Sequence, residues 1–144
     1  TIKEVTNYYV KPSGGMWTST WDNGGNGWTQ FCESEEFGLP SSGMWEGILL
    51  KPRSDARIYV IDSYEDLESL VTKYPFHVVG EVYPDFESIS LDYDAIQLTD
   101  NGQSATRMSA PFNLYGWDFE STLWFRQAFD LVEAVKFPVK QHSY

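Results

Sequence analysis

Apolar residues follow a helical period in one segment of the chain and gather in short runs elsewhere. In the helical segment they recur three or four positions apart, at Tyr64, Leu67, Leu70, Val71 and Tyr74. Ser63 stands ahead of this series as an N-cap, and Pro75 follows it as a stop signal. The pattern therefore predicts a helix over residues 63–74.

Short runs of β-branched, aromatic and aliphatic residues predict strands on both sides of this helix. These runs cover residues 4–10, 16–21, 44–51, 57–61, 76–82, 94–99, 113–117 and 121–125. The third and fourth runs flank a turn at residues 52–55, so we expect these two strands to pair with each other.

The remaining segments carry weaker signals. Short helices are expected at 28–36 and 102–108, a glycine-rich loop at 23–27, and an amphipathic segment at 129–135. We find no internal repeat and no linker within residues 1–144. Strands placed before, between and after isolated short helices favour an α+β fold in a single domain over a repeating βαβ array.

The charge balance is strongly acidic, since 10 Lys and Arg residues face 21 Asp and Glu residues for a formal net charge of −11. A broad basic face for nucleic acid is therefore not expected, because such faces neutralise phosphates with many cations. We find no apolar run long enough for a membrane span, and no signal-peptide pattern in residues 1–10. The one cysteine, Cys32, cannot form an internal disulfide. These features favour a cytoplasmic protein without membrane contact.

Residues that bind metals or serve as nucleophiles are scarce. His77, His142 and Cys32 are too few and too scattered for a zinc site, and residues 92–94 lack the spacing of a calcium loop. We therefore expect no metal. His77 lies in an apolar strand context and is interpreted as a core histidine rather than as the base of a serine hydrolase.

Residues 11–21 combine a basic residue, a glycine turn, aromatic rings and three consecutive hydroxyl side chains. This combination suits an anionic ligand that carries a ring, because indoles stack on flat rings and hydroxyls bond ribose or amide groups. The alternative is a tight hairpin in which a tryptophan anchors the core.

Residues 113–126 place two carboxylates among aromatic residues. Asp118 and Glu120 would share one side of an extended segment, since side chains alternate with a period of two. A carboxylate next to apolar rings is costly unless it is hydrogen-bonded or has a function. The alternative is that both acids face solvent at the start of a strand.

Three short motifs in this sequence resemble small proteins of the ADP-ribosyltransferase fold, and most closely the toxin-like members from bacteria and phages. The motifs are Gly-Gly-Met-Trp-Thr-Ser at 14–19, Ile-Asp-Ser-Tyr-Glu-Asp-Leu at 61–67 and Trp-Asp-Phe-Glu-Ser at 117–121. The resemblance extends from about residue 7 to residue 126. It implies two packed, curved, mostly antiparallel sheets with a few short helices, and it implies NAD as a substrate bound between them.

The resemblance also implies roles for particular residues. Glu120 corresponds to the catalytic acid, and Asp118 corresponds to a position that helps to choose the acceptor, where some members have Gln. The NAD-binding residues it implies are Lys11, Trp17, Thr18, Ser19, Thr20 and Trp21. The three hydroxyl residues would support the ribose and the glutamate, and either Trp17 or Trp21 would flank the nicotinamide. Because the first strand lacks Arg and His, the pyrophosphate would need Lys11 or one of Arg57, Arg107 and Arg126.

The expected function is ADP-ribosyl transfer from NAD to a macromolecular acceptor, a protein or a nucleic acid. The net negative charge makes a protein or small-molecule acceptor easier than DNA or RNA, unless a local groove of Arg53, Arg57, Arg107 and Arg126 reverses it. An antitoxin is a possible partner. One alternative is an acidic interaction or inhibitor protein that binds a basic partner. Another is a carbohydrate-binding module, against which the helix at 63–74 argues.

Overall fold

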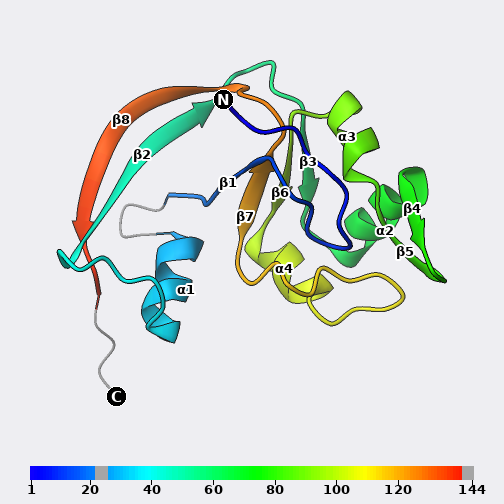
Figure 1. Ribbon diagram of the computed structural model, residues 1–144, viewed down its shortest axis with the longest axis horizontal. Coiled ribbons are helices and arrows are strands. Elements are labelled where there is room, and N and C mark those ends of the chain that lie inside the picture. The colour runs from blue at the N-terminus through cyan, green and yellow to red at the C-terminus, as the bar shows by residue number, and fades with distance from the viewer. Residues whose placement is uncertain (22–25, 141–144) are drawn as a thin grey trace.

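The computed structural model describes residues 1–21 and 26–140, and within them the fold is α+β (Figure 1). The helices of the described part are α1 (Gly27–Glu35), α2 (Tyr64–Lys73), α3 (Phe86–Asp92) and α4 (Asp100–Thr106). The strands there are β1 (Met16–Thr18), β2 (Met44–Pro52), β3 (Ile58–Ile61), β4 (Pro75–Val78), β5 (Glu81–Pro84), β6 (Ala95–Leu98), β7 (Ser121–Trp124) and β8 (Phe129–Pro138). No helix of the described ranges is long and apolar enough to cross a membrane.

The central sheet has four strands in the order β1-β7-β6-β3. Strand β7 runs antiparallel to both β1 and β6, whereas β6 and β3 are parallel. All four residues of β7 are buried, as expected of a strand that is covered on both faces. The main core packs apolar side chains of β3, β6 and β7 against those of α2 and α3, and it includes Ile61, Leu67, Leu70, Phe86, Ile96 and Leu123.

Strands β2 and β8 form a separate antiparallel ribbon with an irregularity in the register between Leu49 and Leu50. In Figure 1 this ribbon arches over α1, on the opposite side of the central sheet from α2 and α3. A second core cluster fixes one end of the ribbon to the sheet, because Phe129 of β8 packs against Trp124 of β7 at 4.9 Å between ring centroids. The ribbon and the central sheet therefore face each other across α1.

The predicted helix at 63–74 is confirmed as α2, and its N-cap Ser63 accepts a hydrogen bond from the backbone N–H of Asp66. The helix predicted at 28–36 is confirmed as α1. Its N-cap Asn26 accepts from the backbone N–H of Thr29, whose hydroxyl in turn accepts from the N–H of Asn26. Both helices therefore begin where side chains satisfy N–H groups that would otherwise be unpaired. Of the predicted loop at 23–27, residues 23–25 lie outside the described residues.

Several strand predictions are wrong, and local turns explain three of them. Residues 4–10 form only an isolated bridge between Thr6 and Ser13, because the chain turns at Tyr9, which has a φ of 52°. The strand predicted at 76–82 is instead the hairpin of β4 and β5, which turns at Val79 and Gly80. His77 is exposed on this hairpin and is not a core residue. Residues 113–117 form a turn, in which the N–H of Trp117 donates to the carbonyl of Leu114.

Two further differences from the predictions concern contacts between segments that are distant in sequence. The predicted strands at 44–51 and 57–61 exist, but they do not pair with each other: β2 pairs with β8 and β3 pairs with β6. The segment at 129–135 is part of strand β8, and helix α3 was not anticipated. Its N-cap, Asp85, also binds the side chain of Asn7 from the N-terminal segment, so its position depends on a partner distant in sequence.

The packing of α4 against β3 yields a prediction. A Cβ on Gly102 would lie 2.0 Å from the carbonyl oxygen of Ile61, so Gly102→Ala must displace backbone. We expect the free energy of unfolding in urea to fall by about 2 kcal/mol. At Gly47 the nearest atom to an added Cβ is 3.8 Å away. The control Gly47→Ala should therefore change the free energy of unfolding by no more than about 0.5 kcal/mol. Equal stability of the two variants would contradict this packing.

Candidate active site

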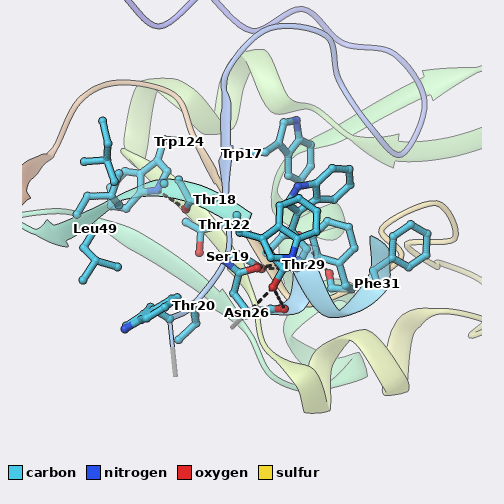
Figure 2. A pocket seen from close by; sticks show the side chains of 18 of the residues that line it. Trp17, Thr18, Ser19, Thr20, Asn26, Thr29, Phe31, Leu49, Thr122 and Trp124 are labelled. Atoms are coloured by element: carbon cyan, nitrogen blue, oxygen red, sulfur yellow. Dashed lines mark hydrogen bonds between the residues drawn. The ribbon is translucent and has the colours of Figure 1, made fainter. Parts of the chain in front are cut away.

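A cavity of about 1350 Å³ lies between β1, α1, the β2–β8 ribbon and the segment that leads into β7 (Figure 2). This volume exceeds the 300–1,000 Å³ typical of ligand sites. In Figure 2, Trp124 and Leu49 lie at one end of the cavity, Phe31 lies at the other, and Ser19 lies between them. In this view the hydroxyl residue Ser19 therefore lies between two ends that both carry apolar side chains.

Ser19 and Thr20 line the cavity and hold the carboxylate of Glu120 by three hydrogen bonds, whereas Glu120 itself is not among the lining residues. Oε1 of Glu120 accepts from the Ser19 hydroxyl at 2.8 Å and from the backbone N–H of Thr20 at 2.6 Å. Oε2 accepts from the Thr20 hydroxyl at 2.7 Å. Glu120 is only 8% exposed, and no Lys or Arg of the described ranges forms an ion pair with it. The hydroxyls and the amide therefore supply the compensation that a buried carboxylate needs.

The register of the central sheet explains why these residues meet. Thr18 of β1 lies opposite Thr122 of β7 in an antiparallel pair. Two residues after Thr18 and two residues before Thr122, the same register places Thr20 opposite Glu120. Helix α1 completes the arrangement from the other side. A Cβ on Gly27 would lie 3.0 Å from both the Ser19 hydroxyl and the Glu120 carbonyl oxygen, so glycine permits this close approach.

The sequence-predicted residues of 11–21 all line the cavity, but they do not all contact Glu120. Thr18 accepts a hydrogen bond from the indole N–H of Trp124 at 3.0 Å and therefore does not support the glutamate. Trp21 packs edge-on against Phe137 of β8, at 5.0 Å between centroids. Ser19 and Thr20 are thus the two hydroxyl residues that hold the carboxylate.

Trp17 and Lys11 form one wall of the cavity. The ammonium of Lys11 lies 5.2 Å from the Trp17 ring centroid, within the range of a cation–π contact. Trp17 also packs edge-on against Trp117 at 4.8 Å and contacts the main core. Trp17 therefore has the core contact that the hairpin alternative expects, and it also lines the cavity.

Lys11 is the one basic residue among the described residues that line the cavity. The three alternatives considered from the sequence, Arg57, Arg107 and Arg126, lie elsewhere, and so does Arg53. Arg126 pairs with Asp94 at 2.8 Å and also donates to the carbonyl of Tyr93. Partial burial opposes ionisation of Asp94, but hydrogen bonds from the Arg57 backbone and the Arg126 guanidinium hold its pKa below the usual range. The arginines therefore do not form a cationic groove at this site.

The second predicted acid differs from Glu120 in its surroundings. Asp118 is exposed and lines the cavity, and the segment from 118 to 120 precedes β7 rather than belonging to a strand. Only Glu120 is buried. The alternative in which an acid faces solvent therefore describes Asp118, and it does not describe Glu120.

One wall of the cavity is aromatic and was not predicted from the sequence. It consists of Trp28 and Phe31 of α1 together with Phe37 and Phe119. Phe119 lies 5.5 Å from each of the two α1 rings, and Trp28 meets Phe37 at 6.3 Å with their planes nearly perpendicular. The i, i+3 spacing of Trp28 and Phe31 on a predicted helix was the available signal for two of the four.

Glu33 fixes α1 to the ribbon and to the chain that follows it. It is buried, and its Oε2 accepts from the indole N–H of Trp45 at 3.0 Å and from the backbone N–H of Lys140 at 2.8 Å. One carboxylate oxygen therefore joins the helix, strand β2 and the chain that follows β8.

This contact predicts the stability of two neighbouring variants. Glu33→Ala removes the acceptor of both donors, and we expect the free energy of unfolding to fall by about 2–3 kcal/mol. Glu35→Ala changes an exposed residue of the same helix and should alter it by no more than about 0.5 kcal/mol. Chemical denaturation of both proteins measures the difference, and a Glu33→Ala protein as stable as the control would exclude the bridging role.

Comparison with known proteins assigns no function to this chain, so the function is argued from the geometry described above. No model of a protein family, no curated protein and no solved structure matches this chain.

Proposed function

We propose that this protein is an ADP-ribosyltransferase that uses NAD as its substrate and Glu120 as its catalytic carboxylate. The observation that carries the proposal is the Glu120 carboxylate, buried and held by Ser19 and Thr20 beside an aromatic cavity. A buried, fixed carboxylate without a cationic partner is costly to stability, and such groups concentrate at functional sites.

The residues around the cavity suit a dinucleotide in three respects. Trp17 and Trp21 line the cavity with indole rings, which suit a flat heterocycle, and Ser19 and Thr20 line it with hydroxyls. Lys11 would pair with the pyrophosphate as the basic residue of the lining. The central sheet and the β2–β8 ribbon enclose the cavity between them, which supports an architecture like that of the ADP-ribosyltransferase fold.

The proposed cleavage of NAD requires a fixed negative charge near the ribose. When NAD is bound, cleavage of its nicotinamide–ribose bond builds positive charge on the sugar, as in glycoside hydrolysis. Glu120 would favour that charge more in the transition state than in the ground state. Its three donors fix the carboxylate before the reaction, so little reorganisation is needed, and its burial limits screening by water. Asp118, exposed at the same cavity, would face the acceptor.

The substitution Glu120→Gln tests this role. We expect release of nicotinamide from NAD to fall at least about a hundredfold, because the charge opposite the ribose is removed. The control is Glu133→Gln, the same change on an exposed residue of β8 that does not bond Ser19 or Thr20, and it should keep full activity. The melting temperature of each variant reports whether its fold is intact. A folded Glu120→Gln protein with undiminished turnover would exclude Glu120 as the catalytic group.

The alternative of an acidic interaction protein rests on the net charge of −11. It makes the opposite prediction for the wild-type chain, which would bind a basic protein in a salt-sensitive complex and release no nicotinamide. Incubation of the wild-type protein with radiolabelled NAD and cell lysate separates the two. Label that survives nuclease but not protease would indicate a protein acceptor.

A further inference from the structure

Strand β8 has an outer edge that no strand of residues 1–21 or 26–140 covers. Its only partner in these ranges is β2, so the backbone groups along the other edge have no strand to pair with. At ten residues β8 is the longest strand of the described part. Leu131 is 61% exposed and Val132 is 59% exposed in the middle of it. A long, exposed, apolar edge strand is a site at which another strand adds to the sheet.

The charges of β8 are placed symmetrically about Glu133. Asp130 lies three residues before it, and Lys136 lies three residues after it. When two copies of β8 run antiparallel with Glu133 opposite its own copy, Asp130 of each copy lies opposite Lys136 of the other. The apolar residues in between also meet in this register, Leu131 with Val135 and Val132 with Ala134. The strand is therefore complementary to a second copy of itself.

The pairing of β8 with β2 extends this complementarity. Within one chain Lys136 lies opposite Glu46, with 3.4 Å between Nζ and Oε1, and Asp130 lies opposite Lys51. Across the four strands of two joined ribbons, each charged row alternates in sign in the order Glu46, Lys136, Asp130, Lys51. Opposite charges on neighbouring strands stabilise a sheet. Glu133 makes one like-charge contact with its copy, against two attractive contacts between Asp130 and Lys136.

The charged side chains of β8 face away from the cavity. Phe129 and Phe137 pack on tryptophan rings of β7 and of the segment after β1. Because side chains alternate along a strand, Asp130 and Lys136, each next to one of these rings, project from the opposite face. Neither lines the cavity, and in Figure 1 β8 lies on the outer side of β2, away from the central sheet. A second copy can therefore reach β8 without entering the candidate active site.

We infer that two copies of this protein pair through β8 into a four-stranded sheet, β2-β8-β8-β2, about a two-fold axis at Glu133. Each copy offers the same strand to the other, so the contact closes as a dimer. The pairing does not depend on the NAD site. Because the contact is limited to one strand from each copy, we expect a dissociation constant of about 10–100 μM.

Reversal of the charges tests the register. Asp130→Lys and Lys136→Asp each turn both attractive contacts of the dimer into repulsive ones. Each should raise the dissociation constant at least about tenfold in sedimentation equilibrium. The double variant Asp130→Lys/Lys136→Asp restores opposite charges between the copies and should return to within about threefold of wild type. The control Glu68→Lys makes the same charge change as Asp130→Lys at an exposed site on α2 and should leave the constant unaltered.

The double variant also separates an effect on the dimer from an effect on the single chain. Within one chain Asp130 approaches Arg53 at 3.2 Å, and Lys136 approaches Glu46 at 3.4 Å. The double variant places like charges at both positions. Damage to the single chain would therefore make it the worst of the three variants, whereas the proposed register makes it the one that recovers. The melting temperature of each variant reports whether its fold is intact.

The wild-type protein supplies a measurement that needs no variant. Amide hydrogen exchange in β8 should slow as the protein concentration rises through the dissociation constant, while exchange in α2 stays the same. A protein that is still monomeric at about 1 mM would overturn the inference, since the register irregularity would then protect the edge. A dimer that the single variants do not weaken, or that the double variant does not restore, would also overturn it, because the contact would lie elsewhere.

Discussion

The burial of the Glu120 carboxylate is the constraint on which the rest of the site depends. An ionised carboxylate can remain at 8% exposure only if donors replace the water that it loses. Here all three donors come from Ser19 and Thr20, directly after β1, so the acid and the edge strand hold each other in place. The same hydrogen bonds fix the point at which the chain leaves the sheet after β1. The contact of Ser19 and Thr20 with Glu120, behind the cavity lining, therefore joins the N-terminal segment to the residues that precede β7.

The cavity needs a second support, because β2 and β8 pair only with each other. A two-stranded ribbon is marginally stable alone, and it must be anchored at both ends to form a wall. Trp124 and Phe129 anchor one end in a small apolar cluster. At the other end the anchor is polar, since Glu33 joins α1 to Trp45 and to the backbone of Lys140. The helix that carries Trp28 and Phe31 of the aromatic wall is thereby placed by the ribbon that it faces.

The sequence predicts the elements whose signals are local. Asn26 and Ser63 mark the starts of α1 and α2 because capping acts within three residues. Strand pairing is not local, and nothing near β2 identifies β8 as its partner. The hairpin at Val79 was missed for another reason, since a β-branched residue with a φ of 41° is not a recognisable turn signal. The residues of 11–21 and Glu120 were selected by their chemistry, whereas the role of Glu33 exists only once three segments have packed together.

The net charge of −11 does not by itself oppose an anionic substrate, because charges act over short distances in salt. At physiological ionic strength the screening length is about 8 Å, so a phosphate responds mainly to the groups that line its own pocket. Lys11 is held at one wall of the cavity, over Trp17, while Glu35, in the last turn of α1, lines the same cavity. Such a separation of signs lets one cavity accept an anion at one wall and a cation at another.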